Sequence, residues 1–161
     1  MARLGIRRSR WFVVPTACCE ASSKMRALEF RSVIVCDDIR KEVTGKEILI
    51  GVYSGEIVLR SFPNQFPASL WIEADTPKAG KHEVVLRVSL TNKPPFQIKF
   101  AIDVRRPGTS SIAIPGLQLQ AEEECDLVIE VQEGEEWRVL KRKKIMRGDV
   151  SSAMSIAPTP G

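Results

Sequence analysis

The sequence predicts an all-β protein, a two-sheet antiparallel sandwich of about eight strands. Between Leu28 and Arg147, apolar residues recur mainly at every second position, which is the period of a half-buried strand. Gly, Pro, Asn and Asp separate these short runs, and helical periodicity is nearly absent. We therefore expect an immunoglobulin-like or C2-like arrangement, with a partly closed barrel as the alternative.

A central hairpin is the clearest element of the pattern. Residues 82–91 place four aliphatic side chains on one face, and residues 96–104 repeat the alternation after the turn Asn92-Lys93-Pro94-Pro95. The next run, 111–120, changes phase at Pro115-Gly116. We expect a β-bulge or a kink at that point.

The other strands are less regular. They are expected over 28–36, 46–53, 56–60, 69–74, 125–132 and 136–145. The first two are rich in Val and Ile, so we place both in the central part of a sheet, with a turn at Thr44-Gly45. Residues 61–67 are expected to form a loop, because their prolines cannot donate to a central ladder.

The ends of the chain are expected to lie outside the sandwich domain, which then spans residues 27–147. Residues 1–26 show no strand or helix pattern, and the clean alternation begins only after Met25, which we take as the translation start. Residues 148–161 are rich in Ser and Pro and have the composition of a flexible tail. The net charge of +4 falls in residues 1–24, whereas residues 25–161 carry 19 basic and 19 acidic side chains.

A cytoplasmic location is expected, and export is the alternative. Arg7, Arg8 and Arg10 precede an apolar run that ends at Pro15 after only four residues, which is short for a secretory signal. In a reducing cytoplasm Cys36 and Cys125 would be buried small hydrophobes, whereas an exported chain could join them in a disulfide. No apolar segment approaches the length of a membrane span.

Catalytic patterns are missing from the sequence. The only histidine, His82, lies at the start of a predicted strand, far in sequence from every cysteine. A serine or cysteine nucleophile needs a positioned base, and a catalytic zinc needs several His or Cys ligands. We therefore expect no enzyme and no cofactor.

Paired carboxylates are the sharpest acidic feature. Asp37-Asp38 follows the first predicted strand, and Asp75 and Asp103 are conceivable partners in a calcium site. These four are weak candidates, because C2-like calcium loops hold several aspartates each. We expect instead a turn in which aspartate accepts backbone N–H groups, and no metal.

A basic run near the end of the body is a possible partner-binding surface. It comprises Lys141, Arg142, Lys143, Lys144 and Arg147. Nucleic acid is disfavoured, because Trp137 is the only stacking aromatic nearby. A charged edge strand that blocks aggregation explains the run without a ligand. Trp71 and Trp137 could line a carbohydrate or peptide groove, but we expect them in the core.

Three stretches carry a resemblance to a known family. They are Val33-Ile34-Val35-Cys36-Asp37-Asp38-Ile39-Arg40, Leu49-Ile50-Gly51-Val52-Tyr53-Ser54-Gly55 and Ser61-Phe62-Pro63. In these stretches the chain resembles a family of small uncharacterised bacterial β-sandwich proteins, defined as a domain of unknown function. The resemblance implies a bacterial, cytoplasmic sandwich and supplies no catalytic residues.

A non-enzymatic interaction or structural module is the function we expect, with another protein as its partner. The alternating pattern, the neutral body and the lack of a nucleophile–base pair support this expectation. The alternative is a domain that binds calcium or a carbohydrate through loops at one end. The oligomeric state does not follow from the sequence.

Overall fold

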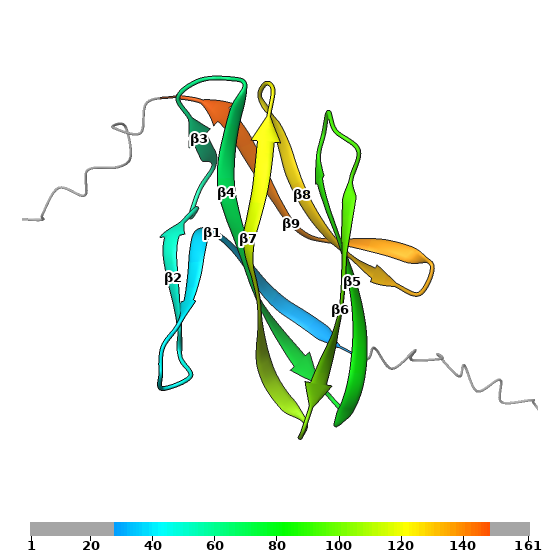
Figure 1. Ribbon diagram of the computed structural model, residues 1–161. Coiled ribbons are helices and arrows are strands. Elements are labelled where there is room, and N and C mark those ends of the chain that lie inside the picture. Colours follow the sequence, from blue (N-terminus) through cyan, green and yellow to red (C-terminus); the bar gives the residue numbers. More distant parts are fainter. Residues whose placement is uncertain (1–27, 149–161) are drawn as a thin grey trace, which may run out of the picture.

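Two β-sheets packed face to face form the part of the chain that the computed structural model describes, residues 28–148 (Figure 1). The strands are β1 (Glu29–Lys41), β2 (Glu47–Val52), β3 (Ile57–Leu59), β4 (Asn64–Thr76), β5 (Gly80–Leu90), β6 (Phe96–Val104), β7 (Gly108–Ala121), β8 (Cys125–Glu133) and β9 (Glu136–Arg147). Sheet A has the order β2-β1-β4-β7, and sheet B has the order β3-β9-β8-β5-β6. The predicted all-β sandwich is confirmed, with nine strands in the described residues.

One strand pair departs from the expected antiparallel pattern. The chain crosses from β2 in sheet A to β3 in sheet B, where Ile57 pairs with Ile145 in a parallel ladder with β9. All other pairs are antiparallel. The parallel pair is only three residues long, so it adds little to the sheet beyond holding the crossover in place.

The core lies between the two sheets and follows the period of two. Val84, Leu86 and Val88 of β5 are buried, whereas Val85 and Arg87 between them are only half-buried. Sheet A contributes the facing residues Val35, Leu70 and Ile72, each at most 1% exposed. Burial of such side chains stabilises the fold by about 2 kcal/mol each before entropy is counted.

The predicted bulge is confirmed at Pro115-Gly116. The register between β4 and β7 shifts between Ala68, which pairs with Leu117, and Leu70, which pairs with Ile114. Gly116 has a φ of +78°, and its N–H donates to Oγ of the buried Ser69. The shift turns Ile114 and Leu117 to the same side of the strand, which explains the phase change in the sequence.

Three strand predictions were wrong. The first strand continues to Lys41, so Asp37 and Asp38 lie within β1 and not in a turn after it. The strand at 46–53 was expected in the centre of a sheet, but β2 is an edge. Residues 64–67 belong to β4, where Pro67 is tolerated because β1 pairs with β4 only from Ser69 onward, which leaves this end of β4 with one neighbour.

Candidate protein-interaction edge

The hairpin formed by the end of β1 and by β2 carries an unusual share of exposed apolar side chains. Val43, at the turn, is fully exposed, and Ile48 and Val52 of β2 are 44% and 47% exposed. Ile48, Ile50 and Val52 occupy alternate positions, opposite Arg40, Asp38 and Cys36 of β1. This apolar row lies on an edge strand of sheet A, and we call it the β2 edge.

The backbone of the β2 edge has free hydrogen-bonding groups. Glu42 N–H donates to Lys46 C=O across the turn, which makes this pair the hydrogen-bonded kind. Hydrogen-bonded and non-hydrogen-bonded pairs alternate along an antiparallel ladder, so the pairs at Ile48 and Ile50, between the turn and Gly51, are also hydrogen-bonded. Beyond Gly51 the alternation is shifted, because Tyr53 N–H donates to Val35 C=O. The N–H and C=O of Leu49 then point away from β1, toward the side on which β2 has no neighbour.

The other three edge strands of the two sheets are protected in ordinary ways. β3 is only three residues long, and the bulge at Pro115-Gly116 interrupts β7. β6 presents Lys99 and Asp103 among its exposed residues, and its single exposed large apolar residue, Phe96, lies at the start of the strand. Short length, bulges and charges are the usual means of preventing pairing at a sheet edge. β2 has a single charge, at Glu47, and no proline.

A polar cluster holds the base of this hairpin. The Tyr53 hydroxyl donates to the Asp37 carboxylate, and Ser69 Oγ donates to the main-chain oxygen of Asp37 at 3.1 Å. Gly51 has a φ of +64°, and a Cβ at this position would lie 2.6 Å from Cγ of Asp37. Burial and the bond to Asp37 raise the pKa of Tyr53, so the phenol stays protonated and keeps donating.

Lys143 ties the same region to sheet B. Its ammonium donates to the main-chain oxygens of Tyr53, of Ser54 at 3.1 Å and of Gly55 at 2.5 Å. These three acceptors use all three N–H donors of a lysine. Burial, with a smaller contribution from Lys141, lowers the pKa of Lys143, while the carbonyls bind its charged form. The segment that leaves β2 is therefore held at Tyr53 and at Gly55.

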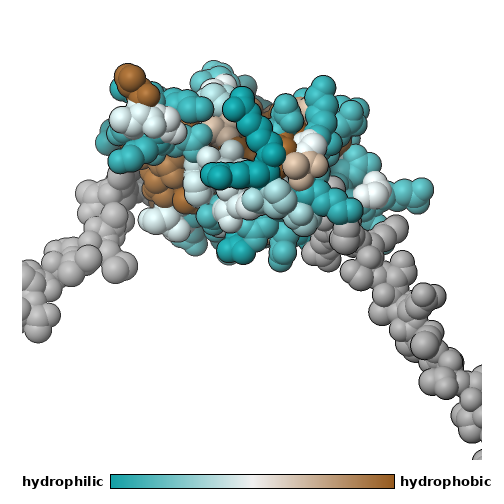
Figure 2. Space-filling model, turned by 90° about the horizontal axis from the view of Figure 1, so that it is seen from below, coloured by the Kyte–Doolittle hydropathy of each residue, from teal (hydrophilic) through white to brown (hydrophobic). Residues whose placement is uncertain are grey.

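The hairpin also contacts β4 of its own sheet. Trp71 of β4 donates its indole N–H to the Glu47 carboxylate at 2.5 Å, which ties the one charge of β2 to its own molecule. Figure 2 shows a mostly hydrophilic face, with exposed hydrophobic residues gathered mainly on the side where β2 lies in Figure 1. The β2 edge is thus held in a defined position and remains accessible.

The four candidate metal ligands do not converge. Asp37 is engaged by Tyr53, and the Asp38 carboxylate accepts from the N–H of Ile39 and from Arg40. Asp75 and Asp103 lie elsewhere: Asp75 pairs with Glu29 at the opposite end of β1, and Asp103 lies on sheet B. Within residues 28–148, no group of three or more His, Cys, Asp or Glu side chains could hold a metal ion.

The basic run does not form one surface. Lys143 is buried at 8% exposure, so its place in a partner-binding set was wrong. Alternation along β9 turns Arg142 and Lys144 outward, and Arg142 is paired with Asp126. β9 up to Lys144 pairs only with β8, so this part is locally an edge, whereas residues 145–147 pair with β3. Arg147 and Lys144 are exposed, and Lys141 is half-buried.

Both tryptophans lie outside the buried core, so the expectation of core packing was wrong. Trp71 and Trp137 are half-buried and lie on different sheets. Arg87 stacks on the Trp137 ring at 4.2 Å from its centroid and pairs with Glu130 on the same face of sheet B. The two indoles therefore do not share a groove.

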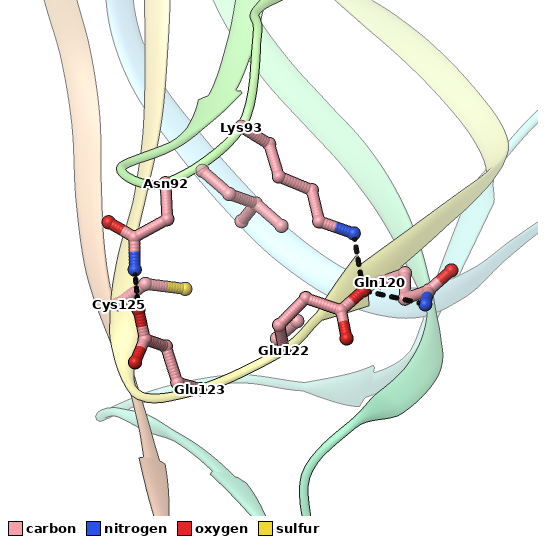
Figure 3. Close-up of a pocket in the computed structure, with 8 residues that line it drawn as sticks. Asn92, Lys93, Gln120, Glu122, Glu123 and Cys125 are labelled. Atoms are coloured by element: carbon pink, nitrogen blue, oxygen red, sulfur yellow. Dashed lines mark hydrogen bonds and ion pairs between the residues drawn. The ribbon is translucent and has the colours of Figure 1, made fainter.

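Cys36 and Cys125 are both free thiols, so the alternative disulfide is not formed. Burial, and then the charges of Asp37 and Asp38, raise the pKa of Cys36, which makes it a poor nucleophile. Cys125 lines a small pocket between the β5–β6 and β7–β8 loops, with an open volume of about 10 Å³. Figure 3 shows its rim closed by the pairs Asn92–Glu123 and Lys93–Glu122. This space holds roughly one water molecule.

Comparison with known proteins gives no family. No family model and no curated protein matches the chain, and the resemblance to bacterial sandwich proteins stays a prediction. In the part of the chain that the structure describes, no helix is long and apolar enough to cross a membrane.

The β2 edge was missed from the sequence. Its signal was present as Ile48, Ile50 and Val52 alternating without a basic residue or a proline. The same pattern also describes a central strand, and only the sheet order distinguishes the two.

Proposed function

We propose that this chain is a non-enzymatic interaction module that binds protein through the β2 edge. The observation that carries the proposal is the exposed row of Ile48 and Val52 on an edge strand with free backbone groups. Protein segments commonly bind such edges by adding a strand, with main-chain hydrogen bonds for affinity and alternate side chains for specificity.

The position of the hairpin supports the proposal further. Asp37, Tyr53 and Lys143 hold the segment that follows β2 in place. Little conformational entropy is therefore lost there when a partner binds. Val43 extends the apolar surface to the hairpin turn. Exposed apolar side chains on a rigid edge are typical of protein-binding surfaces, and they promote aggregation where no partner covers them.

Affinity capture with matched variants tests this function. The full chain is compared with Ile48→Lys/Val52→Lys, which adds charges to the β2 edge, and with Ala101→Lys, which adds a charge to the β6 edge. We expect a protein retained by the parent chain and by Ala101→Lys, and lost with the β2 variant. Equal retention by all three chains would contradict the proposal, as would robust hydrolytic turnover by a chain that retains no protein.

A further inference from the structure

We propose that the occupant of the β2 edge is a second copy of this chain, paired antiparallel through β2 about a two-fold axis. The inference rests on the proposed function, because it names the partner of the same surface. Two-fold pairing requires a surface that is complementary to itself.

The side-chain pattern of β2 meets this requirement. Ile48 and Val52 lie two positions before and two positions after Ile50. An antiparallel copy centred on Ile50 therefore places Ile48 opposite Val52 of the other copy. A copy centred one residue earlier, on Leu49, places Ile48 opposite Ile50. In both registers apolar side chains lie opposite apolar ones, which is favourable in a cross-strand pair.

The backbone of β2 is also complementary to itself. Leu49, next to the centre of the strand, has its N–H and C=O directed away from β1. In the copy centred on Leu49 these groups lie opposite the equivalent groups of the second chain, and in the copy centred on Ile50 they lie opposite Gly51. Sheet A would then continue into its partner as one sheet of eight strands, twice the four that each copy has.

Two exposed charges of opposite sign flank β2 in the sequence. Lys46 precedes the strand and Glu56 follows it; both are exposed, and neither has an ionic partner among the described residues. Antiparallel pairing brings Lys46 of one copy toward the segment that follows Val52 in the other copy, which holds Glu56. The charge of Glu47 does not oppose the pairing, because Trp71 of its own chain binds it.

The length of the contact sets the strength of the dimer. β2 has six residues, and its exposed apolar side chains are few. An interface built on one short strand is smaller than the roughly 1,200 Å² of a stable complex. We therefore expect a weak dimer that forms as the concentration rises.

Sedimentation of the full chain from low micromolar to near-millimolar concentration tests the inference. We expect a monomer–dimer equilibrium that Ile48→Lys weakens at least tenfold and Ala101→Lys leaves unchanged. Ile48 is exposed, so the lysine is tolerated in the fold, and the thermal transition of each variant checks this. A monomer at every concentration, or a dimer that Ile48→Lys does not affect, would overturn the inference.

Cross-linking provides a second readout. In a chain with Cys18→Ser and Cys19→Ser, either Ile50→Cys or Leu49→Cys lies near the two-fold axis and should form a disulfide-linked dimer on mild oxidation, whereas Ala101→Cys should not. A monomeric chain that still captures a different protein through the β2 edge refutes the second copy but preserves the proposed function. A chain that neither dimerises nor captures another protein refutes the second copy and the proposed function.

Discussion

Substitution of Gly51 by alanine tests whether the base of the hairpin is built as described. Gly51 has a φ of +64°, a conformation that costs a residue with a Cβ about 1–2 kcal/mol. The new methyl group would lie 2.6 Å from Cγ of Asp37 and must displace that carboxylate from the Tyr53 hydroxyl. A hydrogen bond to a charged group contributes about 2 kcal/mol. The expected loss of unfolding free energy is therefore about 3–4 kcal/mol.

Gly45→Ala is the matched control. Gly45 also has a positive φ, of +86°, but a Cβ there would meet nothing within 4 Å. Both substitutions reduce the entropy of the unfolded chain equally, so the backbone cost alone remains, about 1–2 kcal/mol. Urea unfolding followed by circular dichroism measures both variants. Equal losses for the two glycines would refute the account of Asp37 and Tyr53.

Three further predictions concern charge. Lys143→Met should lower the unfolding free energy by about 2 kcal/mol, because three main-chain carbonyls lose their charged donor, whereas Lys144→Met should change it by less than about 0.5 kcal/mol in the same urea experiment. The hydrogen bond from Arg87 lowers the pKa of Glu130 below its ordinary value of 4.5. The stabilisation that this hydrogen bond gives the fold is present above pH 4.5 and is lost as the pH falls through the lowered pKa. Glu130→Gln should therefore have a lower unfolding free energy than the parent chain at pH 7, by about 1 kcal/mol or less. This difference should disappear as the pH falls below about 4.5, and a difference unchanged down to about pH 2 would contradict the prediction. Millimolar calcium should leave the melting temperature unchanged, because the four candidate aspartates do not converge; a clear rise would restore the metal site.

Strand existence was predictable from the sequence where one face is buried and the other is not. The alternation of Val84 to Leu90 and the phase change at Pro115-Gly116 both appear in the structure at the expected places. Strand ends were less predictable, because Pro67 is compatible with β4 only where β1 is missing. The candidate site was only partly predicted: Asp37 was singled out as an acidic residue, but its partner Tyr53 was not.

The alternating residues of the chain determined an all-β sandwich, because a period of two leaves one face of each strand apolar and two such faces bury each other. Tertiary structure alone decided which strands lie at the edges, and hence that Ile48 and Val52 are exposed. It also decided that Lys143, in a run of basic residues, lies inside. A strand pattern is local, whereas exposure depends on the neighbours that distant segments supply, and in this chain those neighbours leave the β2 edge uncovered.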